Sequence, residues 1–201
     1  MGYPRITYNS VNIDLVMGKT GLKITPIQDR NVNESGSGKI ETINLFGRFE
    51  YEFDCYFSQA VYHTLWAWWA WARQGKTWTF ALDSAKTGNT TLDDTAASGQ
   101  KVIPVTATTG FAADDYCLLR AVDNDDEFEI IKIASVSSGV SVTAESNLIY
   151  SYNSDDTLRH KGYFPSVVLS NNVKKFDPKY TGVSDTTKKY YKDTIKFTEL
   201  L

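Results

Sequence analysis

Residues 40–83 read IETINLFGRFEYEFDCYFSQAVYHTLWAWWAWARQGKTWTFALD, and this stretch decides the fold. Its first part, 40–55, alternates apolar and polar residues, which predicts a long β-strand with one buried face. Apolar residues follow at helical spacing, and alternation returns over 76–83. We therefore expect a strand, a helix and a second strand in this order, packed on a substantial core.

The helix is predicted over residues 58–74. Ser58 is a suitable N-cap, Gly75 suits the left-handed residue that ends a helix, and Arg73 lies in the last turn, where the helix dipole favours a cation. No other charged residue lies between Ser58 and Gly75, and a helix without a polar face is expected inside its own fold or against another subunit. Its apolar residues form one stripe of Val61, Leu65, Trp68 and Ala72 and a second stripe of Tyr62, Trp66 and Trp69.

Four of the five tryptophans lie in this helix, between Trp66 and Trp71. A platform that stacks single-stranded bases or sugars usually carries interleaved Lys or Arg, and an interfacial membrane helix carries a basic face. The helix has neither pattern. Core packing and a subunit interface both remain open, and the candidate interface residues are Tyr62, Trp66 and Trp69.

The composition of the sequence changes after Asp83. A connector rich in small polar residues spans 84–100, and short β segments separated by turn signals follow, which is typical of a small barrel or sandwich. We interpret 86–160 as an inserted small β-barrel-like module and residues 1–85 with 161–201 as the core domain. The predicted fold class is mainly β with one long helix (α+β). The predicted strands of the module are 101–107, 116–122, 128–136, 140–144 and 156–159.

The amino-acid composition argues against several classes of function. The 201 residues include 21 basic and 24 acidic side chains, a net charge of −3, which argues against binding nucleic acid or an anionic membrane through overall charge. No apolar run is long enough to span a bilayer, and no secretory signal is visible. Two histidines and two cysteines leave little material for a metal site or a nucleophilic triad. We expect a non-enzymatic protein with no cofactor and no metal, in which Cys55 and Cys117 are reduced thiols, although one disulfide stays open.

Two motif-like stretches lack essential residues. Gly18-Lys19-Thr20 lacks the glycine of a phosphate loop, because position 13 is Ile13. The acidic run Asp123–Glu127 lacks the glycine and glutamate of a calcium hand. We interpret the first as a turn and the second as a hairpin tip.

The succession of strand, helix, glycine turn and aromatic strand resembles the distal tail and minor tail protein families of bacteriophages. The matching residues are Phe49–Asp54, Phe57–Gln74, Gly75 and Trp78–Phe80. The resemblance implies a β-sandwich or split-barrel core flanked by the helix, assembled as a hexameric ring around the tail channel, without catalysis. It also implies tail tube, hub or baseplate proteins as partners and a virion tail location after synthesis in the host cytoplasm. From the charge, the helix pattern and the hydropathy given above, we expect no nucleic acid recognition and no membrane insertion. The alternative interpretation is a module that binds carbohydrate or a host surface, which would be a stable monomer with saturable glycan binding.

Overall fold

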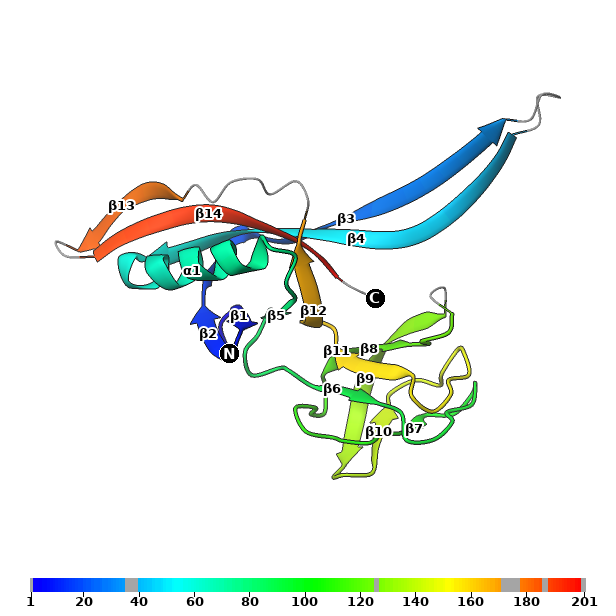
Figure 1. Cartoon of the computed structure of the whole chain (residues 1–201). Coiled ribbons are helices and arrows are strands. Elements are labelled where there is room, and N and C mark those ends of the chain that lie inside the picture. The colour runs from blue at the N-terminus through cyan, green and yellow to red at the C-terminus, as the bar shows by residue number, and fades with distance from the viewer. Residues whose placement is uncertain (1, 35–39, 125–126, 171–177, 186–187, 200–201) are drawn as a thin grey trace. The chain divides into compact units, whose positions relative to one another are not determined.

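The computed structural model describes residues 2–34, 40–124, 127–170, 178–185 and 188–199 (Figure 1). Most of these residues are in strands, and the described part of the chain holds one helix. The strands form two curled antiparallel sheets, each a half-barrel, which confirms the predicted class of a β-sandwich or barrel-like core with a helix. The elements are β1 (Arg5–Tyr8), β2 (Val11–Asp14), β3 (Val16–Glu34), β4 (Ile40–Ser58), α1 (Gln59–Ala72), β5 (Trp78–Ala81), β6 (Asn89–Thr91), β7 (Val102–Pro104), β8 (Tyr116–Arg120), β9 (Phe128–Ser137), β10 (Ser141–Ala144), β11 (Thr157–His160), β12 (Tyr163–Leu169), β13 (Lys179–Asp185) and β14 (Lys188–Glu199).

The chain divides into two compact units. The first unit comprises Met1–Arg5 and Phe80–Pro165, and the second comprises Ile6–Thr79 and Ser166–Leu201. The predicted module 86–160 lies wholly inside the first unit, which also takes in a few residues on either side of it and the first residues of the chain.

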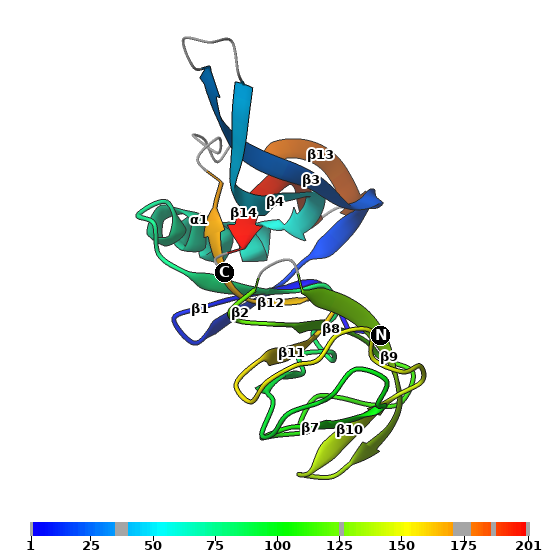
Figure 2. The ribbon, with the colours of Figure 1, turned by 90° about the vertical axis from the view of Figure 1, so that its right-hand side faces the viewer.

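The larger sheet has eight strands in the order β2-β1-β5-β12-β14-β4-β3, and β13 pairs with the other end of β14. β3 and β4 run side by side as a long two-stranded ribbon (Figures 1 and 2). β14 pairs with β4 from Glu50 to Ser58, so this half of β4 has a neighbour on both sides. Pairing on both sides makes this half of β4 a central strand of the sheet.

Alternation over this half of β4 sorts its side chains as predicted. Tyr51, Phe53, Cys55 and Phe57 are buried, and the residues between them are only partly covered. The same alternation predicts that Ile43, Leu45, Gly47 and Phe49 share this face. Phe49 is instead 45% exposed, and the side chains of the other three lie outside what the structure describes. The aromatic core of this unit is completed by Trp78 and Phe197, whose ring centroids lie 5.4 Å apart.

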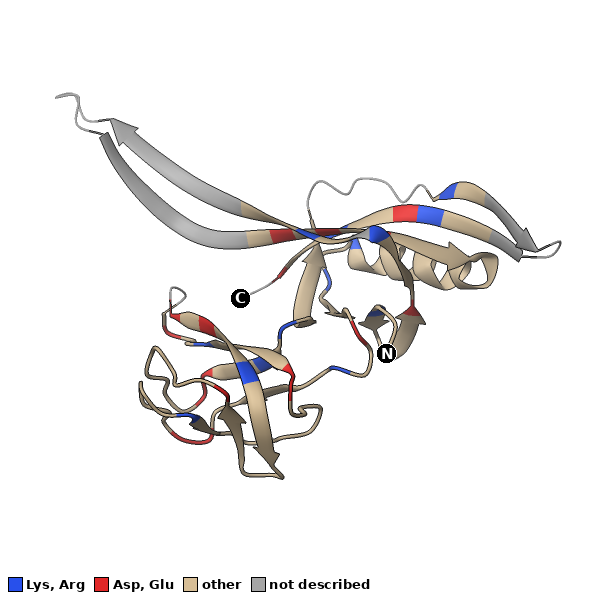
Figure 3. Cartoon of the chain, turned by 180° about the vertical axis from the view of Figure 1, so that it is seen from behind, with Lys and Arg blue, Asp and Glu red and all other residues tan. Residues whose placement is uncertain are grey.

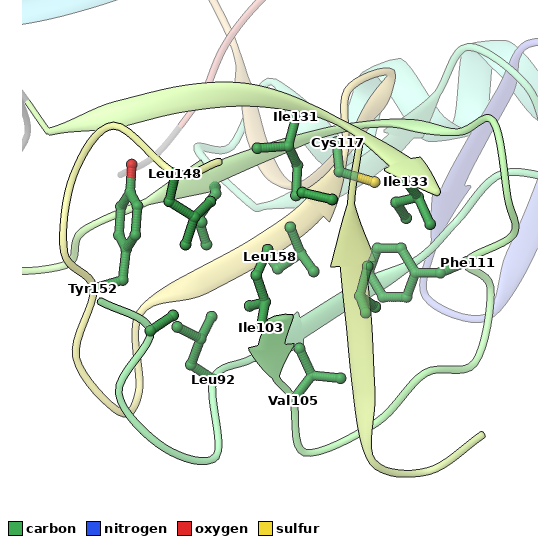
Figure 4. Packing of buried hydrophobic residues seen from close by; sticks show 14 of the residues in the cluster. Leu92, Ile103, Val105, Phe111, Cys117, Ile131, Ile133, Leu148, Tyr152 and Leu158 are labelled. Carbon is green, nitrogen blue, oxygen red and sulfur yellow. The ribbon is translucent and has the colours of Figure 1, made fainter. Parts of the chain in front are cut away.

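The smaller sheet has six strands in the order β6-β11-β8-β9-β10-β7 and folds around an aliphatic core (Figure 4). Leu158 on β11 and Leu119 on β8 are opposite each other and fully buried. Backbone alternation on β9 places Ile131 and Ile133 on the same inner face. Other members of this core are Leu92, Ile103, Val105, Phe111, Cys117, Val142, Leu148 and Tyr152.

Candidate functional site: the outer face of the aromatic helix

The helix α1 begins and ends close to where its sequence predicts. Ser58 has the extended backbone of an N-cap, although its side chain makes no capping hydrogen bond. At the other end, Gly75 adopts a positive φ of 77°, and its N–H donates to the Ala72 carbonyl at 3.0 Å. A side chain with a Cβ is disfavoured in that conformation, which is why glycine suits this turn.

One stripe of the helix lies in the core. Leu65, Trp68 and Ala72 are buried, as the first predicted stripe requires, while Val61 is half-buried. The Trp68 ring meets the Trp78 ring edge to face, with centroids 4.9 Å apart. Burial of this stripe fixes the rotation of the helix and hence the direction of every other side chain on it.

The two flanks of the helix are covered by strands. On one side the Tyr62 ring lies 5.2 Å from the Tyr191 ring of β14 and 6.5 Å from Phe57. On the other side the Trp71 ring lies 5.5 Å from the Tyr8 ring of β1, and the Tyr8 hydroxyl donates to the Thr64 carbonyl at 3.4 Å. Among the described residues, no element covers the outer side of the helix.

The structure places the three predicted interface residues in different surroundings. Trp66 is 52% exposed and points away from the core. Tyr62 is half-buried among the aromatic rings just described. Trp69 is also half-buried, and the Arg73 guanidinium lies over its ring at 4.9 Å from the centroid. Trp66 is therefore the residue of the three that offers most surface to a partner.

The outer side of α1 carries no charge, which is visible as an unbroken tan helix in Figure 3. We call this surface the helix face; its exposed residues are Gln59, Ala60, His63, Trp66 and Ala67. Basic residues follow directly at its C-terminal end, where Arg73 and Lys76 are exposed. A large aromatic side chain surrounded by small uncharged residues is the composition of an interface anchor.

A second exposed apolar surface lies on the outward side of β8 and β9, and the sequence analysis missed it. We call it the strand patch; it consists of Tyr116, Leu118, Phe128 and Ile130. Leu118 and Ile130 are opposite each other in the ladder, and Tyr116, Phe128 and Ile130 are each about half exposed. The signal was present in the sequence, since Phe128-Glu-Ile-Ile-Lys-Ile133 has apolar residues in both phases of the alternation.

The buried acids of the first unit hold loops in place. The Asp156 carboxylate accepts the backbone N–H groups of Val122 and Asn153, both at 2.8 Å. The Glu129 carboxylate accepts the N–H of Ile149 at 3.1 Å. Asp115, at the turn before β8, is paired with Lys86. Asp114-Asp115 and Asp155-Asp156 are adjacent acids in turns, and the buried member of each pair has a structural partner.

The two thiols are free and buried, in line with the predicted reduced state. Burial raises the pKa of Cys117 to about 12 and raises that of Cys55 further still. A thiol held in its protonated form is a poor nucleophile and a poor metal ligand. Within the described residues, no three His, Cys, Asp or Glu side chains are grouped as a metal site requires. In the same part of the chain, no helix has the length and hydropathy to cross a membrane.

Comparison with known proteins finds no family model that matches the chain and no match among curated proteins. Function is therefore inferred from the residues of the helix face and the strand patch.

Proposed function

We propose that this chain is a non-enzymatic structural subunit of a bacteriophage tail, a ring-forming distal tail or baseplate adaptor protein. It assembles as a homo-oligomer, a hexameric ring by the resemblance described above, and meets other tail tube, hub or baseplate proteins in the virion. It has no cofactor and recognises no nucleic acid.

The observation that carries the proposal is the exposure of Trp66 on a helix face without charge. A solvated helix normally presents charged residues outward, and contiguous exposed apolar surface marks interaction sites. Tryptophan is among the side chains most enriched at the energetic centre of protein interfaces. The extensive β structure and the helix between strands β4 and β5 agree with the architecture that the resemblance implies.

The test is the oligomeric state of the purified chain, measured by light scattering after size exclusion, with negative-stain images of the main peak. We expect a ring of about six subunits with a central hole. Trp66→Ala should yield a folded monomer, with an unfolding midpoint close to that of the unmodified chain. Tyr3→Ala is the matched control, since Tyr3 is also an exposed aromatic residue, 61% exposed, but lies off the helix face.

The carbohydrate-binding alternative predicts the opposite behaviour. A chain that stays monomeric at all concentrations and binds a glycan saturably, with binding lost on removal of an exposed aromatic side chain, contradicts the proposed function. If Trp66→Ala assembles as the unmodified chain does, the helix face is not part of the interface.

A further inference from the structure

We draw no further inference here: the strongest candidate, the strand patch on the outward face of β8 and β9, is interleaved with Arg120 and Lys132, and nothing in the described part of the chain shows what covers it.

Discussion

The two units of the chain differ in whether they bury acidic side chains, because the buried carboxylates among the described residues all belong to the first unit. In the first unit, carboxylates such as Asp156 are buried and accept backbone N–H groups from loops. In the second unit, Asp54 and its neighbours lie on the sheet face away from the aromatic core, where Asp54 meets Lys192 at 2.7 Å. The first unit has short strands and many turns, so it needs acceptors for the N–H groups of its loops. The second unit has long strands that satisfy their own backbone, so its acids serve cross-strand pairs.

The largest expected effect comes from the aromatic core of the second unit. Trp68→Ala removes a buried indole packed on Trp78 and should lower the free energy of unfolding by about 3–5 kcal/mol. Each unit also holds one buried thiol, so labelling followed by peptide mass spectrometry reports on the units separately. We expect the variant to speed labelling of Cys55 more than that of Cys117. Equal acceleration of both thiols would show that the two units lose structure together.

The matched control for this change lies on the same helix. Trp66→Ala removes the same side chain from a position that is half exposed, so its effect on urea unfolding of the monomer should be much smaller. If the two substitutions lower the free energy of unfolding by the same amount, the assignment of the buried stripe is wrong.

A smaller effect is expected from a buried acid in the first unit. Asp156→Asn replaces one acceptor oxygen by an N–H donor, which faces a backbone N–H without a partner, and should cost about 1–3 kcal/mol. Here the labelling of Cys117 should accelerate more than that of Cys55. Asp155→Asn is the neighbouring control, because Asp155 is exposed in a left-handed turn at φ 74°, a conformation that asparagine tolerates. A large loss in the control, or none in Asp156→Asn, would contradict the role given to the buried carboxylate.

The pH response should separate the units further. Burial lowers the pKa of His160 from 6.5, and its Nδ1 lies 3.2 Å from the Gly162 N–H, where a neutral ring accepts a hydrogen bond. Below pH 6.5 the unfolded chain takes up a proton more readily than the folded chain, so stability falls as the pH drops from 7 through the lowered folded value. The urea midpoint of the unmodified chain should decrease over this range, and His160→Gln should remove that component. His63→Gln, at an exposed position on α1, is the control. Loss of the same component in the control would assign it to the wrong histidine.

The smallest effect is expected on the open sheet face of the second unit. Hydrogen bonds from Lys192 and then from Thr194 lower the pKa of Asp54 below 3.8. A lowered carboxyl pKa gives stability that is present above about pH 4 and is lost as the pH falls through the folded value. Lys192→Met should therefore raise the pKa of Asp54 in an NMR titration and change the urea midpoint only slightly. An unchanged titration would mean that the lysine is not the main cause.

Periodicity and capping residues were sufficient to predict α1 and the buried face of β4. They could not predict strands whose formation depends on a partner. The polar, Gly/Ser-rich composition of residues 30–39 favours a loop, yet β3 continues to Glu34 because β4 provides backbone partners for its polar residues. The polar composition of residues 171–189 likewise favours a loop, yet β13 lies within this range and pairs with β14.

The candidate site was also predictable only in part, because burial of its residues depends on which strands pack against them. The helical stripe identified Tyr62, Trp66 and Trp69 together, but the spacing alone could not show which of them a strand would cover. Tyr191 on β14 covers Tyr62, and that contact joins residues far apart in the sequence. Burial of Asp156 could not be predicted from the sequence either, because acids in turns are usually exposed.

The position of β14 has a consequence for the order in which the chain folds. Asp54 and Thr194 form a hydrogen bond although they are 140 residues apart, so the central pairing of β4 with β14 closes a very long loop. The Leu82 N–H donates to the Gly162 carbonyl at 2.8 Å, on either side of the inserted strands. If the insert folds first, this contact removes more than half of that loop, and each halving lowers the entropic cost of closure by about 0.6 kcal/mol. Folding of the insert would therefore shorten the loop between β4 and β14 and favour their pairing.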